Sequence, residues 1–553
     1  MSGSASWAPG QAGFRPNLST VHQVFALRHL IDESKAKRKP LYTCFVDFSK
    51  AYDRVPRHLL WQIMGDIGVP QKFVKAIESM YKELQCMVRI QGVAGSRFSS
   101  HVGVKQGCPL SPTLFGLFID RLYFYVQSKA PDLGITLGSG RRIPMLLYAD
   151  DFLLLAHSPE QMHTLLQLVT SFMHSSGMVA NTSQGKTEMV IFGAKDADRA
   201  SLQDLVFLIG GQRIAVVQQY KHLGVMFHEK HGCKIDFDAR RSKVLRATGM
   251  LRHAMAASEA AKSIPLGFSL YDACVRPVAT YASAVWATRF SGVPPSGHVT
   301  GQALEKAHLE FMKTWCRLRP SVPVWALYRE LGRLPLHYFW WRDVFTFWNQ
   351  VVSSPNAFIW QDMLSDAMHR KTRGTWGGEV HAFLRKIGMQ ASVGRLVNMQ
   401  DFSEALLAQY DTVWQNLSQS PRTAADHVRL TTYHRWFSNP HWRKRMPYQF
   451  LRVSAGRMTE FIRFKLGGHN LRIELGRWKN REPREHRVCL RCHEQALDDE
   501  RHLVFECPVF EPLRRKYRHL FGQEVDWSMT KFFAHRDQQS VFQYITSCLR
   551  SLA

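Results

Sequence analysis

The chain has 553 residues and a mass of 63.6 kDa, which is too long for one compact domain and predicts three or four structural units. It carries 72 Lys and Arg against 45 Asp and Glu, a net charge of +27, and its 45% hydrophobic residues suffice for buried cores. This charge favours a polyanionic partner, with nucleic acid first, although a ribosome-associated or merely basic protein has a similar balance.

The sequence pattern argues against a secreted or membrane protein. The residues before Phe14 contain neither the basic stretch nor the apolar stretch of a signal peptide. No apolar run reaches the roughly 18 residues that a membrane span needs. The ten cysteines mostly stand singly in apolar surroundings, which suits reduced thiols inside a cell better than a disulfide framework. We therefore expect an intracellular protein without a membrane partner.

The first predicted elements are a helix and a strand that ends in an acid. Apolar residues at helical spacing predict a helix over residues 20–37. The basic segment at residues 35–40 is interpreted as a solvated helix end, with a nuclear localisation signal as the alternative. The apolar run over residues 41–48 predicts a strand with Asp47 near its end.

Helices and paired strands follow. Amphipathic patterns predict one helix after Pro56 and a second over residues 71–84. Alternating residues predict a hairpin of two strands at residues 86–91 and 98–104. A loop rich in Gly and Pro, residues 103–115, then opens an apolar helix.

The most informative stretch is MLLYADDFLLLA at residues 145–156, where two adjacent acids interrupt an apolar run. An unpaired carboxylate in a core costs several kcal/mol unless its pKa shifts or a cation neutralises it. We therefore predict a hairpin whose turn carries Asp150 and Asp151 to the rim of a sheet, where a divalent metal binds. The alternative is a surface turn with two solvated acids. Further strands at residues 187–192 and 220–227 predict an α+β fold with helices behind an antiparallel sheet.

Beyond about residue 232 the pattern becomes helical. Helices are predicted at residues 240–251, 256–264 and 268–290, followed by a mainly helical segment to about residue 480. The many Trp and Phe residues of this segment are interpreted as packing between helices, rather than as a platform on which bases stack.

Asp47 lies about a hundred positions before the pair of acids, yet both segments are short apolar strands that end in acid. If these strands are neighbours in one sheet, three carboxylates converge. Two Mg²⁺ ions need such a group of carboxylates to hold the oxygens of an in-line phosphoryl displacement.

The segments FVDFSKAYD, GVKQGCPLSPTLF and YADD, in this order, resemble the three palm motifs of a reverse transcriptase. The segments QAGFRPNLST, GKTEMVIFG and YKHLGV are similar to those of the non-LTR, LINE-type retrotransposon branch. The resemblance covers at least residues 11–230. It implies an RNA-directed DNA polymerase that copies an RNA template, using dNTPs and a DNA primer such as a nicked chromosomal 3′-hydroxyl. It also implies a right-hand fold with a palm, partial fingers and an all-α thumb.

The resemblance implies a role for each residue of these motifs. Asp47 and Asp150 would hold two catalytic Mg²⁺ ions, with Asp151 beside them and the backbone carbonyl of Phe48 as a further ligand. Tyr52 would lie under the sugar of the incoming nucleotide and exclude a 2′-hydroxyl by its bulk. The remaining implied residues line the nucleotide pocket (Gln106, Gly107), lie near the triphosphate (Lys186) or form the primer grip (Tyr220, Leu223, Gly224).

A second group of residues has the spacing of a zinc site. CLRC is followed by nine residues, a His, four more residues and a Cys, which gives the set Cys489, Cys492, His502 and Cys507. Thiolates and imidazole at this spacing suit one tetrahedral structural Zn²⁺, and the set resembles the zinc knuckle near the C-terminus of these elements. His493 is an alternative ligand, and chance grouping of three cysteines is the alternative interpretation. Basic flanks on both sides predict salt-dependent contact with phosphates.

The expected organisation has six segments. In order, they are a remnant of the fingers at residues 1–40, the palm at 41–230, a helical thumb at 231–345, a basic helical region at 346–480, a zinc knuckle at 481–515 and a C-terminal helical tail at 516–553.

Only ten residues precede Gln11, where complete elements carry further finger segments, and no endonuclease precedes the palm. We therefore expect a 5′-truncated copy whose target nicking comes from elsewhere, and a protein that is nuclear with a cytoplasmic phase. Two alternatives are a catalytically dead remnant that still binds nucleic acid and a maturase-like RNA-processing factor. The sequence indicates no oligomeric state.

Overall fold

The computed structural model of the chain describes residues 7–194, 205–256, 263–290, 303–320, 322–419, 433, 447–451, 453–476, 482–522 and 528–551. The chain divides into two compact units. Unit 1 comprises residues 1–237, 282–291 and 343–399, and unit 2 comprises residues 238–281, 292–342 and 400–553. No described helix is long and apolar enough to cross a membrane.

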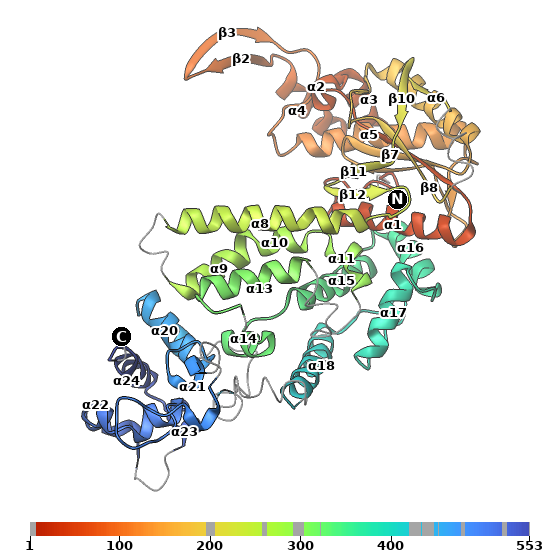
Figure 1. Cartoon of the computed structure of the whole chain (residues 1–553). Helices are drawn as coiled ribbons and strands as arrows, with labels where there is room; N and C mark the ends of the chain where they lie inside the picture. Colours follow the sequence, from red (N-terminus) through yellow and green to blue (C-terminus); the bar gives the residue numbers. More distant parts are fainter. Residues whose placement is uncertain are drawn as a thin grey trace. The chain divides into compact units, whose positions relative to one another are not determined.

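Unit 1 is built on a six-stranded sheet (Figure 1) with the strand order β6-β7-β1-β8-β10-β9. All neighbours are antiparallel except β8 and β10, which are parallel. The strands are β1 (Leu41–Val46), β6 (Met145–Tyr148), β7 (Asp151–Ala156), β8 (Glu188–Phe192), β9 (Phe207–Ile209) and β10 (Gln212–Val216). The predicted α+β class and the hairpin at residues 145–156 are therefore confirmed.

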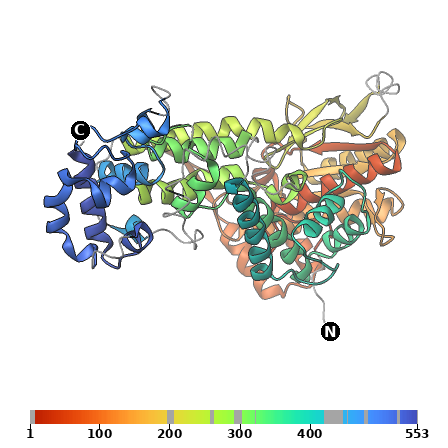
Figure 2. The same cartoon turned by 60° about the horizontal axis from the view of Figure 1, so that its bottom comes forward.

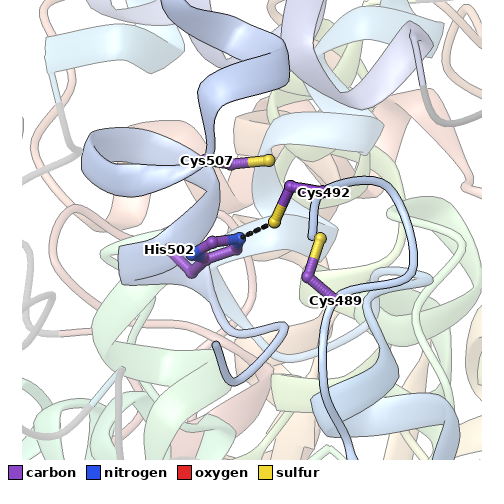
Figure 3. Close-up of side chains that lie close together, drawn as sticks. All are labelled: Cys489, Cys492, His502 and Cys507. Carbon is purple, nitrogen blue, oxygen red and sulfur yellow. Dashed lines mark hydrogen bonds between the residues drawn. The ribbon is translucent and has the colours of Figure 1, made fainter. Parts of the chain in front are cut away.

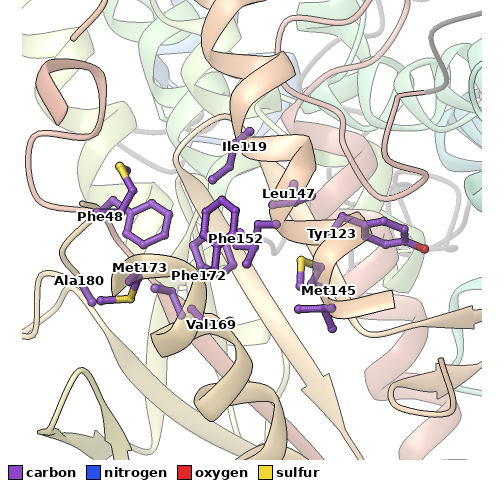
Figure 4. Close-up of a cluster of buried hydrophobic side chains, with 14 of the residues drawn as sticks. Phe48, Ile119, Tyr123, Met145, Leu147, Phe152, Val169, Phe172, Met173 and Ala180 are labelled. Atoms are coloured by element: carbon purple, nitrogen blue, oxygen red, sulfur yellow. The ribbon is translucent and has the colours of Figure 1, made fainter. Parts of the chain in front are cut away.

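Helices cover both faces of this sheet, which explains why its central strands are apolar on both sides. Helix α1 (Thr20–Lys37), at the predicted residues, packs against β1, β6 and β8. On the other face α5 (Ser111–Lys129) and α6 (Pro159–Ser176) pack against each other, and α6 packs against β7. Figure 4 shows the core between them, where Ile119 and Phe172 meet Phe152 of the hairpin. The short helices before α5 are α2 (Ala51–Arg54), α3 (Arg57–Asp66) and α4 (Gln71–Tyr81).

Two hairpins differ from their prediction. The first pairs β2 (Gln85–Ile90) with β3 (Val93–Ser99), so a second strand over residues 98–104 was the wrong prediction. Its tight turn, with positive φ at Gln91 and Gly92, suits a two-residue hairpin loop and moves the second strand toward the N-terminus. Residues 220–227 are likewise not one strand but the hairpin of β11 (Gln219–His222) and β12 (Val225–His228). A separate short pair joins β4 (Ile135–Thr136) and β5 (Arg142–Ile143).

Residues 343–399 also belong to unit 1, although they follow the sheet by more than a hundred positions. Helices α16 (Phe358–His369) and α17 (Trp376–Lys386) pack on each other, and α16 packs on α1. Arg28 Nη2 of α1 donates to Glu379 Oε2 of α17 at 2.9 Å, and Phe25 meets the ring of Trp376 edge-on. Figure 2 shows these helices from a second side. Unit 1 thus contains residues 343–399, most of which belong to the segment expected at residues 346–480.

Short elements at residues 283–289 also belong to unit 1, and they include α11 (Ser283–Trp286). The predicted helix at 268–290 is therefore broken into α9 (Ile264–Cys274), α10 (Arg276–Thr280) and α11. The predicted helix at 256–264 lies largely outside the described residues. Helices α8 (Lys234–Ala256) and α15 (Leu336–Ser353) contribute residues to both units.

Unit 2 is helical, as predicted for the second half of the chain. Its further helices are α13 (Ala303–Trp315), α14 (Val324–Leu331), α18 (Met399–Gln419), α20 (Ala455–Lys465), α21 (Arg472–Leu475), α22 (Glu511–Lys516), α23 (Met529–Phe533) and α24 (Gln538–Arg550). Several of its large aromatic residues are core residues, since Trp340, Trp341 and Trp414 are fully buried. The interpretation of the aromatic residues as packing between helices is therefore confirmed for these three.

Candidate active site and metal sites

The pairing of β1 with β7 brings the three predicted acids to one edge of the sheet. Val46 pairs with Phe152 in antiparallel register, so Asp47 and Asp151 occupy the next positions along the two strands. Asp150 lies in the turn of the hairpin, between Tyr148 and Asp151, which pair with each other. The expectation that the two acid-tipped strands are neighbours is confirmed.

The carboxylates interact electrostatically. Burial, followed by the charges of Asp150 and Asp47, raises the pKa of Asp151 from 3.8 to about 6. Burial also raises the pKa of Asp150, and the charge of Asp47 adds to this shift. Lys186 acts in the opposite direction on both acids. The site therefore holds more negative charge than its surroundings compensate.

Asp47 contacts Asn181 and Thr187, which the sequence analysis did not select as site residues, and the predicted Lys186. Asn181 Nδ2 donates to Asp47 Oδ2 at 3.1 Å, and the backbone N–H of Asp47 donates to Thr187 Oγ1 at 3.2 Å. Lys186 Nζ lies 3.6 Å from Asp47 Oδ1. These three residues lie around the start of β8, the other neighbour of β1. No local pattern marks Asn181, because its contact exists only once β8 has paired with β1.

The arrangement fits a divalent cation. Three half-buried carboxylates face one nearby lysine, and oxygen ligands of this kind suit Mg²⁺. In the part of the chain that the structure describes, one group of acidic, His or Cys side chains has all its ligand atoms within 4.8 Å of one another. This is the cysteine and histidine group described below, and the three acids do not form such a tight group.

The Gly/Pro loop before α5 lies against the segment that carries Tyr52. Val104 N donates to the carbonyl oxygen of Tyr52 at 2.8 Å, and the Tyr52 ring stacks on Phe115 with centroids 4.6 Å apart. Burial and the charge of Asp150 raise the pKa of Tyr52 to about 12, so this phenol stays protonated at neutral pH. The half-buried ring of Tyr52 therefore lies within electrostatic reach of the acids.

Gln106 and Gly107 are exposed at the tip of this loop. Gln106 Nε2 lies 3.4 Å from Asp53 Oδ1, one residue after Tyr52. Gly107 has a φ of +83°, and a Cβ built there meets no atom within 4 Å. The glycine is therefore required by its backbone conformation, while the space around it is open to a ligand.

Phe48 is turned away from the solvent, with its ring 5.1 Å from that of Phe152.

The hairpin of β11 and β12 packs against β1, the strand that precedes Asp47. Tyr220 stacks on Phe45 of β1 with centroids 4.1 Å apart, and its hydroxyl donates to the carbonyl oxygen of Lys186 at 2.7 Å. Burial raises the pKa of Tyr220, and the charges of Asp151 and Asp47 contribute to this shift. The hairpin turns at Leu223 and Gly224, both with positive φ.

The four predicted zinc ligands come together in unit 2 (Figure 3). All four are buried, and their ligand atoms lie within 4.8 Å of one another. Cys489 and Cys492 lie on one loop, whereas His502 opens the helical turn that precedes Cys507. His502 Nε2 lies 3.3 Å from Cys492 Sγ, and its Nδ1 lies 3.7 Å from Glu506 Oε2. His493 is exposed and outside this group.

Three buried thiols beside one imidazole are better explained as the ligands of a zinc ion than as a chance grouping of core residues. Burial raises the pKa of Cys507 to about 11, and the charges of Cys489 and Cys492 add to this shift, so the thiolates need further positive charge. A zinc ion would supply this charge, and a histidine whose second nitrogen faces a carboxylate is the usual zinc ligand. Of the expected basic flanks, residues 477–481 lie outside the described residues, while α22 carries Arg514, Arg515 and Lys516.

The part of the chain that carries the three acids matches a known protein family. Residues 3–227 match the family described as reverse transcriptase (RNA-dependent DNA polymerase). This range contains Asp47, Asp150 and Asp151 together with every other residue of the predicted site up to Gly224. The match thus covers about two fifths of the chain.

Similar curated proteins come from mobile elements. The Pol polyprotein of the type-2 retrotransposable element R2DM of Drosophila melanogaster is 26% identical over 230 residues, which are 41% of this chain and 21% of that protein. A type-1 R2 element polyprotein of Popillia japonica is 29% identical over 177 residues, which are 32% of this chain and 25% of that protein. The RNA-directed DNA polymerase from the mobile element jockey of Drosophila funebris is 25% identical over 221 residues, 39% and 23% of the two chains. The chain thus spans about a fifth to a quarter of these relatives.

Among solved structures, telomerase from Candida tropicalis, in complex with a fragment of telomeric RNA, is 11% identical, with a TM-score of 0.31. The alignment covers 64% of this chain and 53% of that one. This similarity is too low to bear on the fold.

The surplus charge at the acids predicts a pH-dependent stability. Because folding raises the pKa of Asp151 from 3.8 to about 6, its ionised form destabilises the folded protein above pH 6. We expect Asp151→Asn to raise the thermal midpoint without added divalent metal by about 2 °C at pH 7.5. The gain should shrink as the pH falls through 6 and vanish below 4. Differential scanning calorimetry measures it, with the exposed Asp132→Asn as the control, and a lower midpoint for Asp151→Asn at pH 7.5 would contradict this electrostatic account.

Proposed function

We propose that the chain is an RNA-directed DNA polymerase of a non-LTR retrotransposon, acting through two Mg²⁺ ions. The observation that carries the proposal is the meeting of Asp47, Asp150 and Asp151 at one sheet edge, inside the range that matches the reverse transcriptase family. The reaction joins the 3′-oxygen of a primer to the α-phosphorus of a dNTP and releases pyrophosphate. The metals, when bound, stabilise the developing charge on the attacking and leaving oxygens.

In this proposal two of the three carboxylates bind the metals and the third acts through its charge. Asp47 and Asp150 are the metal ligands, and the backbone carbonyl of Phe48 assists Asp47. Asp151 adds negative charge beside them, which strengthens the attraction for cations. The contact of Asn181 with Asp47 supports the proposal, because a ligand that is held in one orientation needs less reorganisation when a metal binds.

The residues around the acids would bind the nucleotide and the primer. Tyr52 would lie under the sugar, and the open backbone at Gly107 would allow the nucleotide to approach closely. Lys186, whose exposed ammonium group is beside Asp47, would contact the triphosphate. Gln106 completes the pocket. Tyr220, Leu223 and Gly224 would hold the primer end, in line with the contact between Tyr220 and β1.

We further propose that Cys489, Cys492, His502 and Cys507 hold one structural Zn²⁺, and that the basic surface of the chain binds the RNA template and the DNA target through their phosphates. The net charge of +27 and the exposed Arg515 on α22, the helix that follows Cys507 in the sequence, support this proposal. Such contacts weaken steeply with salt.

Primer extension on an RNA template tests the proposed polymerase. With Mg²⁺ and dNTPs, the unmodified chain should extend a DNA primer, and Asp150→Asn should lower the rate at least ~100-fold because several kcal/mol of transition-state stabilisation depend on the metals. Asp132→Asn, which changes a 92% exposed carboxylate, is the matched control and should keep the rate. Extension by Asp150→Asn at the original rate would refute the metal role. Binding of primer and template without any extension would support a catalytically dead remnant.

The sugar selection assigned to Tyr52 gives a separate prediction. Tyr52→Ala removes the bulk that lies on Phe115, so the ratio of kcat/KM for dNTP over rNTP should fall by at least ~10-fold. Tyr52→Phe keeps the ring and should keep the ratio. Single-nucleotide incorporation with each substrate measures this ratio, and equal discrimination by the Ala and Phe variants would exclude Tyr52 from sugar selection.

The zinc proposal predicts about one Zn²⁺ per purified chain. Cys489→Ser should lose this zinc, because three ligands hold the ion far less tightly than four. Cys274→Ser changes an exposed cysteine outside the group and should keep it. Inductively coupled plasma mass spectrometry gives the stoichiometry, and unchanged zinc in Cys489→Ser would remove the assignment.

A further inference from the structure

The segment of residues 7–16 forms an extra edge on the acidic hairpin. Leu147 of β6 exchanges two backbone hydrogen bonds with it, donating to the carbonyl oxygen of Gly10 and accepting from Ala12 N, both at 2.9 Å. Gln11 bridges to Leu147 in parallel orientation. Gln23 Nε2 of α1 donates to the carbonyl oxygens of both Gly10 and Leu147, at 2.8 and 2.6 Å. The start of the domain is thus tied to the strand that leads into the acids.

The side chain of Gln11 reaches the turn itself. It is fully buried, and its Oε1 accepts from Ala149 N at 3.2 Å and from Gly13 N at 2.7 Å. Its Nε2 lies 3.4 Å from Asp120 Oδ1 on α5. Gln11 therefore links the residue before Asp150 to the helix that follows the Gly/Pro loop.

Ala149 needs such support because its backbone is strained. Its φ is +56°, in the left-handed region that residues with a Cβ rarely adopt, and it directly precedes Asp150 in the turn of the hairpin. Residues in this region persist only where their surroundings hold them. The N–H of Ala149 is buried with its partner Gln11, and losing that partner would leave a buried donor unsatisfied.

The close approach also explains two glycines of this segment. A Cβ on Gly13 would lie 2.3 Å from Ala149 N, and a Cβ on Gly10 would lie 2.7 Å from the carbonyl oxygen of Met145. Neither glycine has a positive φ, so the requirement at both positions is space alone. Both glycines therefore lie where the segment comes closest to the backbone of the hairpin.

Asp120 anchors the other end of the link. It is buried, and its Oδ2 accepts from Ala8 N at 2.8 Å. Arg15 lies close enough to interact with its charge, and donates through Nη1 to the carbonyl oxygen of Gln11 at 3.0 Å. Both ends of the Gln11 amide thus have fixed partners, which leaves the side chain one orientation.

We propose that Gln11 is a positioning residue for catalysis, which sets the turn at Ala149 so that the carboxylates of Asp150 and Asp151 face the metals. The inference rests on the proposed polymerase function for its kinetic consequence. The link between Gln11 and the turn is independent of that function and can be measured without substrate.

The kinetic test uses Gln11→Leu, which keeps the bulk and removes both acceptor and donor. Displacing reactive groups by about 1 Å costs up to ~100-fold in rate. We expect the extension rate per active site, counted by burst amplitude, to fall roughly 10-fold to 100-fold, and the Mg²⁺ concentration for half-maximal rate to rise. The Kd for primer and template should be unchanged. A residue that only stabilises the fold would lower the burst amplitude and leave the rate per site and the Mg²⁺ midpoint unchanged, and that result would overturn the proposal.

A paired exchange serves as the rescue. Gln11→Glu keeps the acceptor for Ala149 but places a second carboxylate against Asp120, so it should be impaired. Adding Asp120→Asn reverses the polarity of the side-chain contact. The amide introduced on α5 can then donate to the introduced carboxylate and still accept from Ala8, with the number of charges unchanged. Recovery of the rate per site in the double variant is expected, and a double variant no better than Gln11→Glu alone would contradict the link.

Hydrogen exchange gives a readout that needs neither metal nor activity, and it applies even if the chain extends no primer. The Ala149 amide should exchange at least ~10-fold faster in Gln11→Leu than in the unmodified protein, because its buried hydrogen-bond acceptor is lost, and return toward the original rate in the double variant. Peptides from β8 serve as the internal control for global unfolding. Unchanged protection at Ala149 would overturn the positioning role whatever the polymerase assay shows. If the unmodified chain extends no primer but Gln11→Leu still exchanges faster at Ala149, the link between Gln11 and the turn stands and only the proposed polymerase function fails.

Discussion

The antiparallel pairing of β1 with β7 is the interaction on which the rest of the structure depends. It brings together two segments a hundred residues apart and fixes Asp47 beside Asp151. A shift of one residue in this register would turn every side chain of a strand to the opposite face, and would separate the acids. The buried faces prevent such a shift, because Cys44 and Leu154 would exchange places with residues that pack on α1.

The same core allows an unfavourable concentration of charge at its edge. The pKa values of Asp150 and Asp151 are raised by burial and by like charges, so the site is destabilised until cations neutralise it. Residues distant in sequence hold this edge in place: Asn181 orients one acid, and Gln11 supports the turn that carries the others. The stability of the scaffold thus compensates for local strain and repulsion that serve metal binding.

Much of this arrangement could be predicted from the sequence, because apolar strands that end in acids have few explanations. The hairpin and the grouping of the four zinc ligands follow from local pattern, and the meeting of the three acids follows once two apolar strands that end in acid are taken as neighbours. Contacts formed only by the tertiary fold could not be predicted, such as Asn181 with Asp47, the Gln11 link and the packing of residues 343–399 on α1. The second strand of the first hairpin was predicted too far along the chain, because the tight turn at Gln91 and Gly92 starts β3 already at Val93.

The central claim is that Asp47 and Asp150 share a pair of divalent ions. Crystals of the chain with a primer, an RNA template and a non-hydrolysable dNTP analogue, grown in Mn²⁺, test it most directly through anomalous scattering. We expect two peaks about 4 Å apart, both within coordination distance of the carboxylates of Asp47 and Asp150. Ordered substrates with no anomalous peak between these two residues would contradict the account.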